Sequence, residues 1–385
     1  MKLVVCLGAL GYLSTKVSLN DTVRLAESPQ KKYRLLSDES ADPLHIRDPE
    51  TGMERTVHRS ELADQATHLK KDQRPIELGL KTVVHRAEWS WVRWALLIFT
   101  PTTFVMAWRL RCLLATQEIS LSYRDALLLT FAGNFFNFAM PGTTGGDLYK
   151  AYHIAKRTQK RTEGITVVLL DRVVGLISFL LIAAPAIFAA RGTEIVGDFG
   201  RWVGYLMLAL IAGGLLFFSK RLRRLVHYDH WLNRLPFADK LRRVDETAFS
   251  FRYHRRQAAL SLIVTLVNHF CIITAIYFLA RSLGIDPIGD RSASELYLAV
   301  LISTVVGYLF AAIPISVQGF GLMEAVFLKV MVGGLWCDAS TMLVLTLGAR
   351  LLQVFWSLPG VLVPWLGLER PKETVETSKS SPASG

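Results

Sequence analysis

Polar, charged and helix-breaking residues interrupt an apolar part of the sequence between Phe135 and Arg172. An apolar segment with two asparagines leads into PGTTGGD at 141–147, a basic connector follows, and Asp171 and Arg172 stand inside the next apolar segment. At membrane depth, irregular backbone and charge are tolerated where they are buried in protein or line a wet cavity, and helix ends there can bind ions and headgroups. The pattern predicts binding of a polar group, with most of the remaining chain acting as scaffold.

The first break begins at Pro141, which removes a backbone donor and precedes three glycines that adopt conformations other residues resist. The glycines are Gly142, Gly145 and Gly146. If Asp147 opens the next helix, it is placed to cap that helix, and Lys150 shares its face. Two interpretations stay open: a polar-headgroup site at the membrane boundary, and a tight turn between two spans with a capping aspartate.

Asp171 and Arg172 lie several residues inside an apolar segment, where a charge costs ~2.5–3.5 kcal/mol at the helix centre. Adjacent helical side chains diverge by about 100°, so the two need different partners. One interpretation is a buried charge network with a functional or structural role. The alternative is that both lie close to the cytoplasmic interface and extend their charged ends toward water.

The segment PISVQGFGLME at 314–324 repeats the features of the first break, because Pro314 is followed by Gly319, Gly321 and Glu324. This weak internal repeat is typical of transporters that place two broken elements around a central site. Each element is a candidate gate. Glu324 and Arg350 are candidate partners for Arg172 and Asp171, and the sequence alone does not assign the pairs.

Asparagine and histidine side chains occur inside other apolar segments, at Asn134, Asn137, Asn268 and His269. Such residues commonly hydrogen-bond neighbouring helices to one another. The two asparagines before Pro141 are also candidate ligands of a headgroup, and His269 is a candidate proton relay.

The composition indicates a polytopic membrane protein, since the 385-residue chain is 51% hydrophobic, its mean hydropathy is +0.31 and it has several apolar windows of about 20 residues. The net charge of +12 is concentrated in two connectors. The positive-inside rule explains this excess better than nucleic-acid binding does, and anionic lipid headgroups are the natural partners of such loops.

No catalytic or metal-binding motif is recognisable, whether Walker A, GxSxG, HExxH, CxxC or a Rossmann fingerprint. The four cysteines are widely scattered, as expected of small buried apolar residues. The sequence therefore predicts neither a cofactor nor a metal, and an enzyme is the less favoured class.

The expected architecture is an all-α multi-pass membrane protein of about seven to nine membrane segments, two of them re-entrant or broken. Residues 1–19 form a short first segment, a signal peptide or a misassigned start. Residues 20–88 are a polar insertion with hairpin character at Tyr33–Leu36, Leu44–Arg47 and Met53–His58. Residues 89–367 form the membrane domain, and residues 368–385 a disordered tail.

Several segments within the membrane domain are expected to span. They are Glu88–Trp108, Ile165–Ala190, Trp202–Ser219, Ala258–Ala280, Glu295–Ile313 and Thr341–Leu366. Arg109 and Arg111 are expected to end the first of these spans. Tyr123–Met140 is too interrupted for a simple span, because Gly133, Asn134 and Asn137 are expected to break it.

The basic connectors Gly146–Glu163 and Lys220–Gln257 are expected in the cytoplasm. The side on which residues 20–88 lie depends on the segment Tyr123–Met140. If that segment crosses the membrane, residues 20–88 are cytoplasmic. If it is a re-entrant hairpin, they lie outside.

Four stretches together resemble the transmembrane region of the lysylphosphatidylglycerol synthase family. They are WRLRCLLATQEISLSY at 108–123, FAGNFFNFAMPGTTGGDLYKAY at 131–152, the Asp171-Arg172 pair and QGFGLMEA at 318–325. The resemblance covers most of residues 90–367, and residues 20–88 look like an insertion outside the usual pattern. In fused relatives this region resembles a flippase that moves aminoacylated phosphatidylglycerol between leaflets, while a separate domain makes the lipid. With 18 residues after Gly367, we expect no synthase domain and no aminoacylation.

The resemblance implies translocation or binding of a phospholipid or lipid-linked headgroup in a membrane, with a bacterial inner membrane as the expected location. Anionic phospholipid or polyprenyl-linked species are the expected partners, together with a lipid synthase or glycosyltransferase. Two alternatives remain, namely an accessory protein that binds polyprenyl-phosphate or anionic lipid for a separate glycosyltransferase, and a membrane transferase using Asp147 and Asp171.

Overall fold

The computed structural model describes residues 11, 17–63, 69, 74–140, 145–190, 201, 204–205, 208–209, 212–213, 224, 254–286, 291–312, 319–366 and 372–373. Several predicted features lie wholly or mostly outside these residues. They are the segment 1–19, Pro141, Gly142, Pro314, the span Trp202–Ser219, the connector Lys220–Gln257 and the tail 368–385.

Five helical stretches among the described residues are long and apolar enough to cross a membrane. They are Trp89–Ala115, Arg161–Ala189, Arg255–Ser282, Ala293–Ala311 and Ala339–Leu366. Each meets the length of about 20 residues that ~30 Å of hydrocarbon requires. The chain is therefore an α-helical, multi-pass membrane protein, and these spans correspond to the predicted ones apart from Trp202–Ser219.

The first span differs from its prediction at its end. It consists of α3 (Trp89–Phe99) and α4 (Pro101–Ala115), and Pro101 stands at the first turn of α4, where a missing N–H is tolerated. The helix continues through Arg109 and Arg111, which the sequence led us to expect as its end. It can do so because Arg109 is buried and finds partners inside the bundle.

The first hairpin consists of α5 (Tyr123–Ala139) and α6 (Gly145–Arg157). The expected break inside α5 is wrong, because the helix runs through Gly133 to Ala139. A Cβ atom on Gly146 would lie 1.9 Å from the Gly133 carbonyl oxygen, so the glycines let the two helices pack backbone to backbone. Asn137 Oδ1 also accepts a hydrogen bond from Gly146 N at 2.8 Å.

This hairpin enters and leaves at the same end of the bundle. Lys160, just before α7 (Arg161–Ala189), forms an ion pair of 2.5 Å with Glu118, which lies just before α5. α6 therefore ends at the same end of the bundle at which α5 begins.

The second hairpin consists of α13 (Ala293–Ala311), the short α14 (Leu322–Phe327) and the π-helical turn η2 (Leu328–Val332). Its base is closed by a hydrogen bond of 2.8 Å from Arg291 Nη1 to the Gly334 carbonyl oxygen. Near its tip, Gly319 has a φ of +71° and packs so closely on Ala311 that a Cβ atom there would lie 2.3 Å from the Ala311 Cβ atom.

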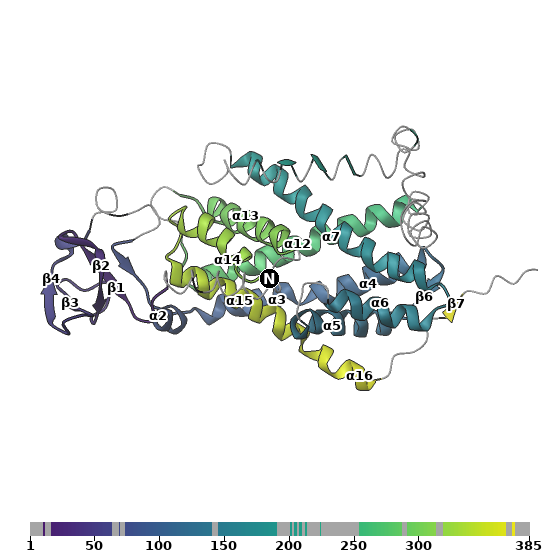
Figure 1. Cartoon of the computed structure of the whole chain (residues 1–385), viewed down its shortest axis with the longest axis horizontal. Coiled ribbons are helices and arrows are strands. Elements are labelled where there is room, and N and C mark those ends of the chain that lie inside the picture. Colours follow the sequence, from purple (N-terminus) through teal and green to yellow (C-terminus); the bar gives the residue numbers. More distant parts are fainter. Residues whose placement is uncertain are drawn as a thin grey trace, which may run out of the picture.

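The two hairpins enter from opposite ends (Figure 1). Glu88, at the start of α3, donates a hydrogen bond of 2.8 Å to the carbonyl oxygen of Ser282, which ends α12 (Arg255–Ser282). That end of the bundle also carries the base of the second hairpin, whereas α4 runs across to the base of the first (Figure 1). The weak repeat predicted from the sequence falls on these two hairpins, and it stays a prediction because both of its prolines lie outside the described residues.

A five-stranded antiparallel sheet in the order β4-β3-β2-β1-β5 precedes the bundle and lies at the end where the second hairpin enters (Figure 1). Its strands are β1 (Thr22–Leu25), β2 (Ser28–Leu35), β3 (Leu44–Arg47), β4 (Glu54–Val57) and β5 (Ile76–Glu77). The pairing of β3 with β4 matches two of the predicted strand segments. The sheet has its own apolar core, built around Val23, Leu44 and Ile46.

Further elements occur among the described residues. They are η1 (Arg59–Glu61), α2 (Leu80–His85), β6 (Ile119–Ser120), α15 (Ala339–Ser357), η3 (Leu358–Leu362), α16 (Val363–Leu366) and β7 (Lys372–Glu373). The largest apolar core joins α3, α7, α12, α13, α14, η2 and α15, and a smaller one joins α4 to α7. A polar cavity lies within this bundle.

Candidate functional site: a polar cavity between two hairpins

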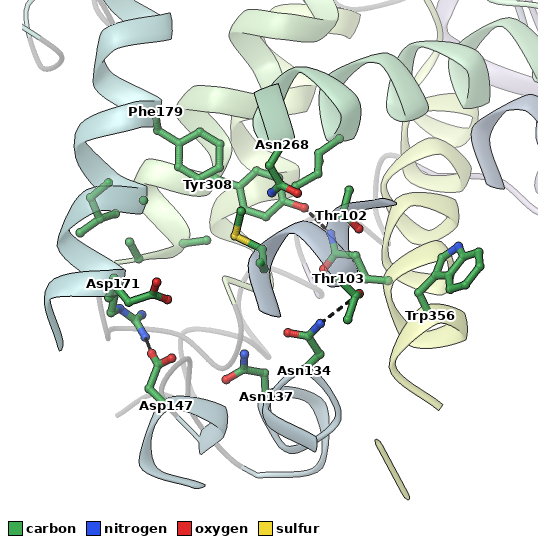
Figure 2. A pocket seen from close by; sticks show the side chains of 18 of the residues that line it. Thr102, Thr103, Asn134, Asn137, Asp147, Asp171, Phe179, Asn268, Tyr308 and Trp356 are labelled. Atoms are coloured by element: carbon green, nitrogen blue, oxygen red, sulfur yellow. Dashed lines mark hydrogen bonds and ion pairs between the residues drawn. The ribbon is translucent and has the colours of Figure 1, made fainter. Parts of the chain in front are cut away.

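A cavity of about 400 Å³ lies inside the helical bundle, and residues of both hairpins line it. The first hairpin contributes Asn137 and Asp147 to its wall, and the second contributes Ala312 and Met323. Helices α4, α7, α12 and α15 and the end of α3 form the remaining walls. Figure 2 shows Asn134 and Asn137 on one side of the cavity and Asp147 and Asp171 on the other.

Arg172 of α7 joins the first hairpin to the long helices. Its Nη1 atom donates a hydrogen bond of 2.5 Å to Asp147 Oδ2, and the two side chains are 27% and 24% exposed. Asp147 stands in the first turn of α6, where the helix dipole favours a negative charge. The pair therefore ties the tip of the first hairpin to α7 while remaining half-buried (Figure 2).

Asp171, the neighbour of Arg172, has a different partner, as the 100° offset between adjacent residues requires. Arg109 Nη2 of α4 lies 2.5 Å from Asp171 Oδ1 and also donates a hydrogen bond of 3.1 Å to the Asp171 backbone oxygen. A second donor of the same guanidinium, Nη1, bonds Thr265 Oγ1 of α12. Arg109 thereby joins three helices in the middle of the bundle.

Glu324 and Arg350 form the most deeply buried pair, with exposed side-chain fractions of 2% and 10%. Two nitrogens of Arg350 donate to Glu324 Oε1, at 2.8 and 3.1 Å. The other carboxylate oxygen accepts from Gly321 N at 2.7 Å, and the guanidinium stacks on Phe320 at 3.8 Å from the ring centroid. This pair ties the second hairpin to α15.

Uncharged polar groups line the space between these pairs. Asn134 Nδ2 donates to Thr103 Oγ1 at 3.5 Å, and Gln353 Nε2 donates to the Tyr308 hydroxyl (Figure 2). Asn268, although it is only 6% exposed, has a side-chain oxygen without a hydrogen-bond partner. The indole nitrogen of Trp356 is likewise buried and unpartnered. Buried polar groups are normally satisfied, so these atoms indicate room for a polar ligand or for water.

The structure brings together most of the residues that the sequence singled out. Those on the cavity wall are Asn134, Asn137, Asp147, Asp171, Arg172 and Arg350. Glu324 lies behind Arg350, and Gly145, Gly146, Gly319 and Gly321 shape the hairpins. Lys150 packs along Gly133 of α5 and is not part of the wall. Pro141 and Pro314 lie outside the described residues.

The pairing differs from the one considered from the sequence. Glu324 and Arg350, suggested as partners of Arg172 and Asp171, bind one another, while Asp147 and Arg109 fill those roles. Asp147 is also not a cap ahead of its helix, since α6 begins two residues earlier and the carboxylate reaches across to α7. His269 stacks on Phe179 at a centroid distance of 3.7 Å.

Sequence reasoning missed Arg109, Thr103 and Tyr308. Arg109 was interpreted as a residue that ends a helix, and an arginine near the end of an apolar segment usually does so. The spacing of the two arginines could have revealed this. Arg109 stands two residues before Arg111, so the two side chains point to different faces of a helix and cannot both face the interface. The structure buries Arg109 and leaves Arg111 exposed.

The chemistry of the cavity is balanced in charge, with each of its three arginines facing a carboxylate. Such a site offers donors and acceptors in place of water and carries little net charge. Among the described residues, no group of three or more histidine, cysteine, aspartate or glutamate side chains could hold a metal ion. The arrangement is suited to binding and desolvating a polar group within an apolar bundle.

The comparison with known protein families agrees with this architecture. The family model of the lysylphosphatidylglycerol synthase TM region matches residues 79–360, which is well over half of the chain and includes both hairpins and the cavity. No curated protein matches the chain. The sheet of residues 22–77 precedes the matched region. The chain belongs to the lysylphosphatidylglycerol synthase TM-region family, a family of membrane proteins connected to lipid handling.

Proposed function

We propose that the protein translocates the headgroup of a phospholipid or lipid-linked molecule across the membrane while the acyl or prenyl chains stay in the lipid. The observation that supports the proposal is a polar cavity, lined by residues of three ion pairs, to which two hairpins from opposite ends of the bundle contribute. Repeat-built transporters place substrates at such midplane sites between broken helices.

The barrier to lipid translocation is the desolvation of the headgroup. A single charge at the centre of a bilayer costs ~2.5–3.5 kcal/mol on insertion scales and more by other measures. Asn134, Asn137 and Asn268 supply hydrogen bonds in place of water, and the ion pairs supply charges of both signs. A phosphate or a cationic group that leaves water can then interact with the oppositely charged member of an ion pair, so that its charge stays compensated.

The two hairpins serve as gates in this scheme. Asp147 and Arg172 would open one side of the cavity, and Glu324 and Arg350 the other. Opening either pair while the other stays closed exposes the cavity to one side at a time. Lys150 and the neighbouring basic connector would attract anionic headgroups to the entrance. The proposal is a statement about lipid movement, so its test measures that movement directly.

The experiment reconstitutes the full chain into liposomes containing phosphatidylglycerol or phosphatidylethanolamine with a fluorescent acyl chain. Loss of fluorescence to an impermeant reductant reports the outer-leaflet fraction, and translocation raises the bleached fraction from about half toward completion. We expect Asp147→Asn to reduce the rate at least tenfold while the protein stays monodisperse. Arg111→Gln is the matched control, since it removes an exposed arginine from α4 and should leave the rate unchanged.

The outcomes separate the candidate functions. Retention of the wild-type rate in Asp147→Asn would remove the charge network from the mechanism. Binding of either lipid without movement by the wild-type chain would favour an accessory role in presenting lipid to a separate enzyme. Chemical conversion of the labelled lipid would favour a transferase.

A further inference from the structure

The N-terminal sheet docks on the turn that joins the second hairpin to α15. Arg74, just before β5, donates a hydrogen bond of 2.8 Å from Nη2 to the Leu335 carbonyl oxygen. Leu78 N donates to Asp338 Oδ2 at 3.0 Å, and Ser18 N donates to Ser340 Oγ at 3.4 Å. The segments on both flanks of the sheet therefore hold the same turn.

Asp338 is the central residue of this contact. It is 6% exposed, and its second oxygen, Oδ1, accepts from Thr341 N at 2.6 Å as the N-cap of α15. One carboxylate thus joins the sheet to the helix that carries Arg350, the partner of Glu324. Asp21 secures the sheet side of the joint, accepting from Gly79 N at 2.6 Å and from the Thr82 hydroxyl at 3.0 Å.

The same turn is also held from within the bundle. Arg291 donates to the Gly334 carbonyl oxygen at 2.8 Å and stacks over the Trp336 ring at 4.6 Å. Leu335 has a φ of +59°, an uncommon conformation for a residue with a branched side chain. Such a conformation persists where surrounding contacts fix it.

The second helix of the first hairpin, α6, is less buried than the returning part of the second hairpin. Only three of the thirteen residues of α6 are buried, namely Gly145, Gly146 and Ile154. In the second hairpin, four of the six residues of α14 and three of the five residues of η2 are buried. Segments with few buried contacts open at lower free energy, and moving elements are drawn from them.

We propose that the N-terminal sheet is a brace that positions the second hairpin, so that α5 and α6 form the gate that opens more readily of the two. Arg74 and Asp338 are positioning residues in this arrangement. They touch no cavity atom and act on Arg350 and Glu324 through the start of α15 and the turn before it. The inference rests on the proposed translocation for its functional meaning, but the brace itself is testable without transport.

The first experiment measures amide hydrogen exchange on the full chain in detergent or nanodiscs. In the wild type we expect slower exchange over residues 322–340 than over residues 145–157. Arg74→Gln should speed exchange over residues 322–340 by about tenfold, the effect of losing one hydrogen bond to a buried group, and leave residues 145–157 unchanged. Arg34→Gln, on the exposed face of β2, is the control and should change neither. Unchanged exchange over 322–340, or an equal rise in both hairpins, would overturn the brace.

The second experiment joins the brace to the bundle covalently. A Ser18→Cys/Ser340→Cys pair, in a chain whose native cysteines are replaced, is oxidised or bridged and assayed for lipid movement. We expect the bridged protein to move lipid within twofold of its reduced form. If the bridge stops lipid movement and reduction of the bridge restores it, this joint must open during translocation, and the proposal is overturned. If the wild type moves no lipid, the proposed function fails while the exchange measurement still decides the brace.

Discussion

The two hairpins reach the same cavity from opposite ends, yet they are fixed to the bundle in different ways. The first is tied at its tip by Asp147 and Arg172, which are about a quarter exposed, and at its base by the surface pair of Glu118 and Lys160. The second is tied by Glu324 and Arg350, which are almost fully buried, and at its base by Arg291 and the N-terminal sheet.

This difference shows that related elements can share a plan and differ in local stability. A buried ion pair with satisfied hydrogen bonds is rigid, because losing either partner leaves a charge in low dielectric. A partly exposed pair can exchange its partner for water or for a ligand at lower cost. The asymmetry of the two ties therefore suits one hairpin for holding and the other for opening. Four predictions test this comparison, from the largest expected effect to the smallest.

The first prediction concerns the side of the membrane on which each end of the bundle lies. The measured labelling is expected to be complete at one site and absent at the other. If the Lys156 end of the basic segment Gly146–Glu163, most of which is α6, is cytoplasmic, the sheet lies on the outer face, because α5 begins and α6 ends at the same end of the bundle. Met53→Cys, on the exposed surface of the sheet, should then react with an impermeant maleimide in intact cells. Lys156→Cys, on α6, should react only after the membrane is opened. Labelling of both sites from one side would contradict the opposed arrangement of the hairpins.

The second prediction compares the two ion pairs. Arg350→Ala strands the Glu324 carboxylate in the core and should cost ~3–5 kcal/mol of unfolding free energy. Arg172→Ala should cost less than about half as much, because Asp147 retains access to solvent. Denaturation in mixed micelles measures both. The double variant Glu324→Gln/Arg350→Gln should recover part of the unfolding free energy lost in Arg350→Ala. Equal losses in Arg350→Ala and Arg172→Ala would show that the two hairpins are held equally firmly.

The third prediction concerns the tip of the first hairpin. Gly146→Ala places a Cβ atom against the Gly133 carbonyl oxygen and should destabilise the protein by ~1–3 kcal/mol while loosening α6. Gly175→Ala is the control, because a Cβ atom there meets nothing within 4 Å, and it should be neutral or stabilising by up to ~1 kcal/mol. Thermal unfolding of both variants provides the measurement, and similar midpoints would show that the close approach of α5 and α6 is dispensable.

The fourth and smallest effect is a pH dependence at the base of the first hairpin. The Lys160 ammonium lowers the pKa of the Glu118 carboxyl below its ordinary value of 4.5. Because the folded-state pKa is the lower one, the pair stabilises the hairpin fully above about pH 4.5 and loses this contribution as the pH falls through the folded-state value. Exchange over residues 145–157 should then rise slightly in acid, relative to residues 322–340. The same rise in Lys160→Gln would rule out this pair as its cause.

The sequence by itself determined the class of the protein and the residue types of its site. Stretches of about 20 apolar residues identify spans because the hydrocarbon thickness is fixed, and charged residues inside those stretches stand out because each is costly. Asp171, Arg172, Glu324 and Arg350 were therefore identifiable as special positions. The glycines beside Asp147 likewise marked a place where only small residues fit, which the structure shows to be the close contact of α6 with α5.

Only the tertiary structure decided which charge meets which. Arg109 pairs with Asp171 from a distant helix, and Arg172 turns to Asp147 rather than to Glu324. Such choices depend on how the helices are oriented and packed against one another, which hydropathy does not encode. Tertiary packing also decided the role of Gly133. The sequence predicted a helix break there, but the residue lies inside α5 at a close contact with α6. A glycine's local freedom can be used for a turn or for packing, and the neighbouring helix decides between them.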